Sequence, residues 1–238
     1  MPINAKSYII APTPRIPNSP HPLLHYPGLL KETVTSPTFT PTQLTDLYAK
    51  NGWQTQWIAK YGADIQSHYH STTHEAMTVI SGAGATIRFG VADAPDWKPG
   101  MYAPGERGEH GEEGGIEIEA RIGDVFIIPA GVAHKTFAPR PESSDLAFHQ
   151  PQDVAEGRAA EVNEKTEQER RRFFETVPIR AQFMMMGAYP YGGVWDFSVG
   201  GERGREHVWT VPVPDKDPVL GDSKEGLVGV WNRSGLEK

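Results

Sequence analysis

Four side chains carry the chemistry that this sequence suggests, and three of them lie within eight positions. His68 and His70 are separated by one residue, and Glu75 follows after the polar stretch 71–74. Side chains at positions i and i+2 of a β-strand point to the same face, so the two imidazoles share a face. A turn at residues 71–74 lets the next strand aim the Glu75 carboxylate at the same point. Two histidines and one carboxylate form the facial ligand set that suits Fe(II), Mn(II) and similar divalent ions with open coordination positions.

A second stretch, residues 123–134, supplies another histidine. A strand-like run is followed there by a turn containing Pro129 and Gly131, and a return strand begins at His134. We therefore expect one divalent metal ion to be bound. Imidazole and carboxylate ligands accept Fe, Mn, Zn, Ni or Co, so the residue types do not distinguish the metal. The candidate metal ligands are His68, His70, Glu75 and His134.

Each candidate ligand also has an ordinary structural interpretation. The histidines could be surface or packed side chains, and Glu75 could be a solvent-exposed carboxylate. Ligation is the better interpretation because the four residues stand in register within two separate motifs. His74 directly precedes Glu75, so its side chain should point the opposite way, and we interpret it as a structural residue beside the metal ligands.

Strand parity also predicts which residues line a pocket beside the metal. Side chains two or four positions from a candidate ligand on the same strand share its face. The run 183–186 contains three methionines, which could form an adaptable apolar wall for a ligand. Ordinary core packing is the simpler interpretation of each position. The pocket candidates are Gln66, Met77, Val79, Thr136 and Met185.

The elements that position these residues are predicted to be short β-strands. The chain has 238 residues, of which 25 are glycine and 21 are proline, while apolar residues make up 38%. So many turn formers beside aromatic and β-branched residues favour an all-β barrel or sandwich over a helical bundle. Strand-like patterns cover residues 53–89, 116–119, 124–128, 135–138, 182–189 and 208–211.

The N-terminal region differs in composition from the part of the chain that is predicted to form strands. Residues 1–41 are rich in proline, which removes backbone donors and keeps a chain extended, so we expect an arm that lies on the body of the protein. Leu44, Leu47 and Tyr48 recur at helical spacing before Gly52. This spacing predicts a short helix that ends near the glycine.

Two later segments are expected to interrupt the strands. Residues 93–115 combine turn formers with an acidic stretch, which predicts a mobile loop in solvent. Residues 140–180 form the second insertion, and a run near 152–176 is rich in Ala, Glu, Gln and Arg. That composition predicts a charged surface helix.

Composition excludes several classes of function. There are 23 Lys and Arg residues against 30 Asp and Glu residues, a net charge of −7, and no basic tract, which argues against binding to nucleic acid. The chain has no cysteine, so it has no disulfide, thiol nucleophile or cysteine zinc site. It shows neither a signal-peptide pattern nor a stretch of membrane-spanning length, and we expect a cytoplasmic protein with no membrane partner.

The two histidine-containing stretches resemble the two motifs of the cupin superfamily. The first runs from Gly62 to Gly82 with the histidine pair and the glutamate at the motif spacing. The second runs from Gly123 to His134 with its glycine, proline and histidine in place. Ala138 stands where cupins usually have an asparagine, which puts one polar contact in doubt but not the ligand set. The resemblance implies a small jelly-roll β-barrel that holds a metal.

Shorter matches narrow the resemblance to bacterial YjlB-type single-domain cupins. They are NGW at 51–53, HYHSTTHE at 68–75, IPAGVAHK at 128–135, GAYP at 187–190 and VPVPDKDPV at 211–219. The reactions of that family are largely unassigned, so the resemblance implies a scaffold and a metal site but no substrate. It implies one cupin domain over 1–238, with an arm at 1–41, a barrel at about 53–231, and insertions at 93–115 and 140–180.

The expected function is that of a divalent-metal-dependent enzyme acting on a small organic molecule. An incompletely filled coordination sphere inside an apolar barrel suits an oxygenase first, and an isomerase or lyase second. The alternative is a non-catalytic module that binds a small metabolite, because no general base or oxyanion device can be named. A third hypothesis is storage or scaffolding through a homodimer in which the arm embraces a partner barrel. Trp53 and Trp57 could close a barrel end or form a dimer contact.

Overall fold

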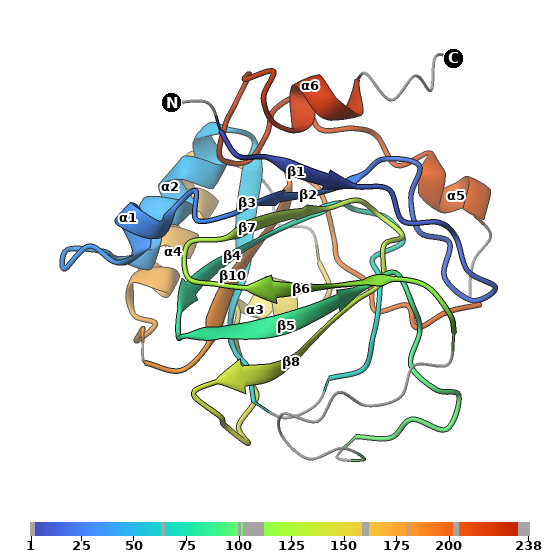
Figure 1. The fold of residues 1–238 in the computed structure, drawn as a ribbon. Coiled ribbons are helices and arrows are strands. Elements are labelled where there is room, and N and C mark those ends of the chain that lie inside the picture. Colours follow the sequence, from blue (N-terminus) through green and yellow to red (C-terminus); the bar gives the residue numbers. More distant parts are fainter. Residues whose placement is uncertain are drawn as a thin grey trace.

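The computed structural model describes residues 3–62, 65–99, 101, 112–158, 162–179, 181–201 and 205–232. Two antiparallel sheets form the centre of this part, and helices lie beside the larger sheet (Figure 1). The larger sheet has the order β1 (Lys6–Tyr8), β2 (Leu23–Tyr26), β7 (Val125–Ile128), β4 (Glu75–Ser81), β10 (Met184–Pro190), β3 (Trp53–Lys60) and β9 (Ala147–His149). The smaller sheet has the order β6 (Ile116–Ala120), β5 (Gly84–Phe89) and β8 (His134–Arg140).

The helices within the described residues are short, and two of them exceed five residues. They are α1 (Lys31–Val34), α2 (Pro41–Lys50), α3 (Gln152–Ala155), α4 (Glu164–Glu175), α5 (Arg205–Trp209) and α6 (Leu227–Trp231). None of the helices in the described ranges is long and apolar enough to cross a membrane.

The inner strands of the larger sheet, between β1 and β9, are buried on both faces. Along β4, Ala76 and Ile80 pack into an apolar cluster shared with residues of α1, α2, α4 and α6. Met77 and Val79 pack into a second cluster that contains residues of both sheets. This alternation follows the two-residue period of a strand. The second cluster therefore lies between the sheets, and β4 carries its first residue, Glu75, to the edge of that space.

Helix α2 confirms the helix predicted near residues 42–51. Pro41 occupies its first turn, where the missing N–H leaves no hydrogen bond unmade. Leu44 and Tyr48 are buried one turn apart against the larger sheet, and the Tyr48 hydroxyl lies 2.5 Å from Oγ1 of Thr78 on β4. Gly52 follows with a φ of 79°, a left-handed conformation that glycine adopts without strain.

The proline-rich segment is less separate from the body than an arm would be. Its strand β2 pairs with β1 on one side and with β7 on the other, with Leu24 opposite Ile127. The four residues of β2 are fully buried. The sequence suggests only an extended segment because Pro22 and Pro27 flank this short strand. The structure makes it an inner strand of the larger sheet.

The prediction of a strand at residues 208–211 is wrong. Residues 205–209 form α5 instead, in which Val208 is buried and Trp209 is 37% exposed. Val208 packs with Ile16 and Tyr69, while Val211 packs at the edge of the same cluster. The two valines are three residues apart, a spacing that suits one face of a helix and not one face of a strand. Their β-branched composition therefore misled the prediction.

The two predicted insertions have different outcomes. The charged helix near 152–176 is present in two pieces, α3 and α4, and α4 begins with a capping box between Asn163 and Thr166. It is also anchored, because Phe174 is fully buried and Arg170 donates to the Thr55 carbonyl oxygen at 3.2 Å. The centre of the loop predicted at 93–115 lies outside the described residues.

Candidate metal centre

A short extended segment presents the histidine pair. The N–H of His68 donates to the His134 carbonyl oxygen at 3.2 Å, and the N–H of His134 donates back to the His68 carbonyl oxygen at 2.8 Å. On its other side, Tyr69 exchanges backbone hydrogen bonds of 2.8 and 3.1 Å with Ser198. Tyr69 is fully buried in an apolar cluster away from the histidines. His68 and His70 therefore share one side of the segment, as strand parity predicts.

Turns bring the other two candidate ligands to the same place. Glu75 is the first residue of β4, and His134 is the first residue of β8, one strand from each sheet. The turn before His134 includes Gly131 at a φ of 87°. A Cβ atom there would lie 2.7 Å from the Asn18 carbonyl oxygen, so the turn requires glycine.

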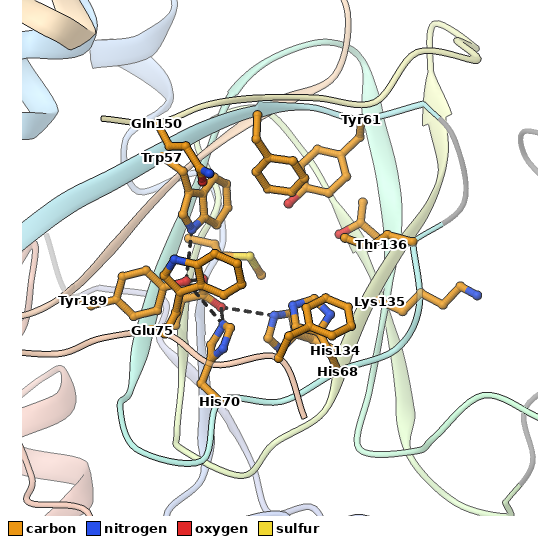
Figure 2. A pocket seen from close by; sticks show the side chains of 15 residues that line it. Trp57, Tyr61, His68, His70, Glu75, His134, Lys135, Thr136, Gln150 and Tyr189 are labelled. Carbon is orange, nitrogen blue, oxygen red and sulfur yellow. Dashed lines mark hydrogen bonds and ion pairs between the residues drawn. The ribbon is translucent and has the colours of Figure 1, made fainter. Parts of the chain in front are cut away.

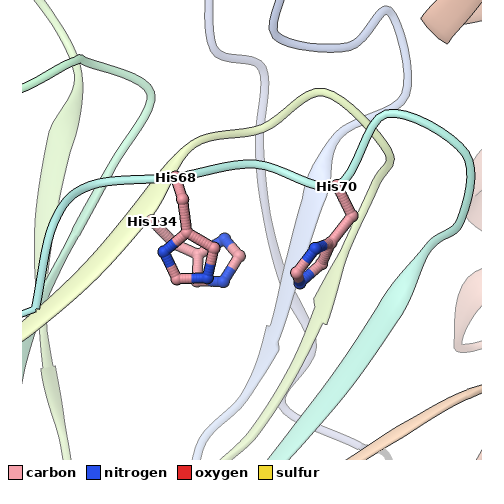
Figure 3. Close-up of side chains that lie close together, drawn as sticks. All are labelled: His68, His70 and His134. Atoms are coloured by element: carbon pink, nitrogen blue, oxygen red, sulfur yellow. The ribbon is translucent and has the colours of Figure 1, made fainter. Parts of the chain in front are cut away.

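The four residues predicted to bind metal meet in the structure, and Figure 3 shows the three histidines among them. One ring nitrogen from each of His68, His70 and His134 lies within 4.8 Å of the other two. Oε2 of Glu75 lies 3.4 Å from Nε2 of His70 and 3.2 Å from Nε2 of His134. Two atoms each about 2.1 Å from one ion, at tetrahedral or octahedral angles, are roughly 3.0 to 3.4 Å apart. The distances from Glu75 match this spacing.

Backbone carbonyls determine which ring nitrogen faces the cluster. The Nδ1 atom of each histidine lies against a carbonyl oxygen, which can only accept a hydrogen bond. The acceptors are Gln66 for His68 at 3.0 Å, Asp196 for His70 at 2.5 Å and Val132 for His134 at 3.3 Å. Each Nδ1 therefore carries the proton, and each Nε2 is left with a lone pair. Metal-binding histidines are oriented in this way.

The residues therefore fit a bound cation. Glu75 is 1% exposed, and its Oε2 atom has no hydrogen-bond donor among the described residues. The Nε2 lone pairs of His70 and His134 face this oxygen, an arrangement that repels unless a proton or a cation lies between them. Three imidazole nitrogens and a carboxylate oxygen are suitable donors for Fe, Mn, Zn, Ni or Co.

The ionisable groups are strongly coupled without a metal. Burial lowers the pKa of His68 well below its ordinary value, and the neighbouring His134 and His70 lower it further. Burial also acts to lower the pKa of His70, but the Glu75 carboxylate outweighs it and the pKa is raised. Burial acts to raise the pKa of Glu75, but His70 and His134 hold it well below its ordinary value. Glu75 is thus ionised, and its charge favours the protonated form of His70.

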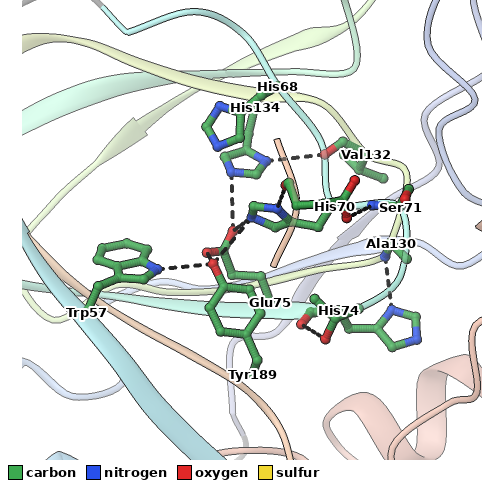
Figure 4. A network of polar contacts seen from close by, with 12 residues as sticks. Trp57, His68, His70, Ser71, His74, Glu75, Ala130, Val132, His134 and Tyr189 are labelled. Atoms are coloured by element: carbon green, nitrogen blue, oxygen red, sulfur yellow. Dashed lines mark hydrogen bonds and ion pairs between the residues drawn. The ribbon is translucent and has the colours of Figure 1, made fainter. Parts of the chain in front are cut away.

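A tyrosine and a tryptophan fix the orientation of Glu75 (Figure 4). The Tyr189 hydroxyl donates to Oε1 of Glu75 at 2.5 Å. Trp57 Nε1 donates to the same hydroxyl at 3.1 Å, so Tyr189 acts as acceptor and donor at once. Burial raises the pKa of Tyr189 well above its ordinary value, and Glu75 raises it further, which keeps the phenol protonated. This chain holds Oε1 and leaves Oε2 turned toward the histidines.

Residues 194–198 form one wall of the metal centre. The Asp196 carbonyl oxygen is the acceptor for His70, and the Asp196 side chain accepts from the N–H of Ser71 at 2.7 Å. The ring of Phe197 stacks on His68, with centroids 4.1 Å apart and planes 11° from parallel. This segment therefore fixes the orientation of two of the three histidines.

Asp93 joins the two backbone segments that carry histidines. Its Oδ2 atom accepts from the N–H of Ser67, next to His68, at 2.7 Å. Its Oδ1 atom lies 3.1 Å from Nζ of Lys135, next to His134, and both side chains are almost completely buried. A single carboxylate therefore connects both segments.

His74 lies outside the cluster and has the opposite tautomer. Its Nδ1 accepts from the N–H of Ala130 at 3.0 Å, and its Nε2 donates to the Pro212 carbonyl oxygen at 3.1 Å. Burial lowers its pKa to about 4, and nearby His21 also lowers it. A second proton would remove the acceptor for Ala130. This histidine has a structural role in a neutral form.

A cavity of about 180 Å³ opens beside the ligand set (Figure 2). Of the pocket candidates, Met77 and Thr136 line it. Val79 and Met185 are fully buried in the apolar cluster between the sheets, and neither is among the residues that line this cavity. Gln66 is not among its lining residues either, and contributes its carbonyl oxygen to His68. Val79 lies four residues from Glu75 on β4, which places it about 13 Å further along the strand and away from the cavity.

Several functional residues are missed by sequence reasoning. Tyr189 has the same strand parity as the pocket candidate Met185, so strand parity extended along this strand could have found it. Trp57 could not be found in this way, because the register shifts between Trp57 and Thr55 and leaves Gln56 unpaired. The bulge puts Trp53 in the helix-side cluster and Trp57 in the cluster between the sheets. The further lining residues that were missed are Tyr61, Ile65, Lys135, Phe148, Gln150, Trp195 and Phe197.

Ala138, which stands where cupins usually have an asparagine, has an unusual backbone conformation. Ala138 has a φ of 49°, in the left-handed region that asparagine tolerates better than alanine. It lies where the register between β5 and β8 shifts, since Thr86 pairs with Phe137 and Gly84 with Arg140. A bulge with a left-handed residue explains the preference for asparagine at this position without a contact to the metal centre.

Comparisons with known proteins agree with the two motifs. Residues 54–164 match the family model described as Cupin. The uncharacterized protein YjlB of Bacillus subtilis (strain 168) is 25% identical over 231 residues, which cover 95% of this chain and 96% of YjlB.

Two solved structures are also similar over part of the chain. The coconut allergen cocosin is 14% identical with a TM-score of 0.26, over 63% of this chain and 29% of cocosin. Procruciferin, an 11S globulin from Brassica napus, is 11% identical with a TM-score of 0.24, over 60% of this chain and 35% of procruciferin. This chain thus spans about a third of the length of either protein.

The cupin match and the two antiparallel sheets fit a β jelly-roll, as the motifs predict. The similarity to YjlB extends beyond the matched cupin region to nearly the whole chain. Together these findings support a YjlB-like protein of the cupin superfamily.

Proposed function

We propose that this protein binds one divalent metal ion through His68, His70, Glu75 and His134, and that it is a metal-dependent enzyme acting on a small organic molecule. The observation that carries the proposal is the convergence of imidazole lone pairs on a buried carboxylate oxygen that has no donor of its own among the described residues. An oxygenase is the first candidate, and an isomerase or lyase is the second.

The proposed chemistry divides between the ion and the chain. A bound divalent ion would supply a Lewis acid for a carbonyl or enolate oxygen, or, as iron, a centre that activates O₂. The three histidines and Glu75 hold it, and Tyr189 keeps Glu75 in a single orientation. The aromatic side chains around the cavity exclude water from the reacting molecule.

Replacement of one ligand tests the metal site. His70→Ala should lose bound metal and keep its fold, because His70 lies at the edge of a cavity and its removal leaves both sheets intact. His207→Ala removes an exposed histidine of α5 and is the matched control. The two purified variants are compared by elemental analysis and circular dichroism after loading with Mn, Fe or Zn. Full metal stoichiometry in His70→Ala would show that the ligand assignment is wrong.

A second candidate is a non-catalytic module that binds a small metabolite. Outside the proposed ligands, the ionisable residues described around the cavity are Tyr61, Tyr189 and Lys135. Burial raises the pKa of both tyrosines, and the Lys135 ammonium is paired with Asp93. No general base is available among them, which favours a binding function. Azide added to the Co(II) protein distinguishes the two: a spectral change shows an open coordination position, as an enzyme needs, and no change favours the module.

We also infer that the two sheets close into a jelly-roll barrel within a single cytoplasmic domain, and that two chains form a dimer. The apolar cluster shared by both sheets supports the barrel. Light scattering of the purified protein tests the dimer, and a monomer at micromolar concentration would contradict it.

A further inference from the structure

The walls of the cavity beside the metal centre are mainly aromatic. Six aromatic side chains line it, from β3, the residue that follows β3, β9, β10 and the segment 194–198 (Figure 2). They are Trp57, Tyr61, Phe148, Tyr189, Trp195 and Phe197. Flat faces of this kind bind flat apolar molecules well and bind polyols poorly, because hydroxyl groups would lose their water without finding partners.

Two of these rings lie at the rim of the cavity. Phe148 is 42% exposed and Phe197 is 45% exposed, although both line the cavity. Phe197 stacks on His68, and Phe148 meets the ring of Trp57 edge to face with centroids 5.9 Å apart. Covering these rings with a ligand would remove apolar surface from water, which favours binding.

The charge around the cavity limits the charge of the ligand. The only basic side chain among its described lining residues, apart from the histidines, is that of Lys135, and Asp93 pairs with it. A divalent ion held by Glu75 and three neutral histidines leaves a net single positive charge. One negative charge on the ligand would neutralise the site, whereas a phosphate dianion would leave a second charge desolvated without a partner.

We propose that the cavity binds a small, flat and largely apolar monoanion, with its charged oxygen toward the metal ligands and its apolar body between the aromatic rings. The same arguments disfavour polyols and phosphorylated metabolites as substrates. Gln150 and Thr136 line the cavity and can each form a neutral hydrogen bond with the ligand. This inference rests on the proposed metal site.

Three probes test it by calorimetry on the dialysed, Zn-loaded protein, after its metal content has been measured. Salicylate is a flat monoanion, gluconate is a polyol of the same charge, and phenyl phosphate is aromatic with a second charge. Salicylate should bind at least about tenfold more tightly than either of the others. Equal or tighter binding of gluconate or phenyl phosphate would overturn the inference.

A rim variant tests the location. Phe148→Ala should weaken salicylate binding about fivefold, since roughly 40 Å² of covered ring surface is lost, and should keep the metal content of the wild type. Val162→Ala removes part of another exposed apolar side chain, 41% exposed and not lining this cavity, and should bind as the wild type does. Unchanged salicylate affinity in Phe148→Ala would overturn the inference. Absence of metal from the wild type would instead overturn the proposed function.

Discussion

Tyr189→Phe removes one hydroxyl that touches a proposed metal ligand without being one itself. The hydroxyl donates to Glu75 Oε1 at 2.5 Å and accepts from Trp57 Nε1 at 3.1 Å. A hydrogen bond to a charged group contributes about 1.5 to 3 kcal/mol. If this energy orients Glu75 for the metal, its loss weakens metal binding about 10- to 100-fold. The variant should still fold, because the phenylalanine ring fills the same space.

Competition with a chromophoric chelator measures the metal affinity of this variant. Tyr191→Phe is the matched control, because its hydroxyl donates to the Ala49 carbonyl oxygen, away from the metal centre, and the tyrosine is partly exposed. The control should bind metal as the wild type does, with circular dichroism confirming that both variants are folded. Wild-type metal affinity in Tyr189→Phe would refute the role assigned to this chain of hydrogen bonds.

Three further predictions concern stability. Asp93→Asn removes the carboxylate charge that pairs with the buried Lys135 ammonium and should lower the free energy of unfolding by about 3 kcal/mol or more in urea; a change under about 1 kcal/mol would contradict this. Ala138→Asn should raise the free energy of unfolding by about 0.5 to 1 kcal/mol, because the left-handed backbone suits asparagine better, and a lower melting temperature would contradict it. For His74, a folded pKa of about 4 against an ordinary value near 6.5 means that the folded state disfavours protonation. Its contribution to stability is therefore complete above pH 6.5 and is lost as the pH falls toward 4, by at most about 3 kcal/mol. We expect the free energy of unfolding of the metal-free protein, measured between pH 8 and 4, to fall less with acid in His74→Asn than in the wild type. An identical pH dependence in the two proteins would contradict this.

The sequence predicts that the four candidate ligands lie close together, because their placement obeys local rules. The parity of His68 and His70, the turn before Glu75 and the glycine before His134 depend on neighbours in the chain. The structure places these four side chains together with no adjustment to that reasoning. Helix α2 is predicted for the same reason, since its buried residues recur at helical spacing.

The features that were missed depend on contacts between distant segments. The bulge at Gln56 places Trp57 in the space between the sheets, and no local pattern marks the bulge. The segment 194–198 lies beside the histidines through its pairing with Tyr69 and its bonds to Ser71. Strand β2 is too short, between two prolines, for its alternation to be recognised.

Crystals of the wild-type protein grown with Mn or Zn, measured on both sides of the metal absorption edge, test the central claim most directly. We expect one anomalous peak per chain, about 2.0 to 2.3 Å from Nε2 of the three histidines and from a Glu75 oxygen. No peak at this position, or a peak held by other residues while the four side chains remain apart from it, would contradict the assignment of a metal centre.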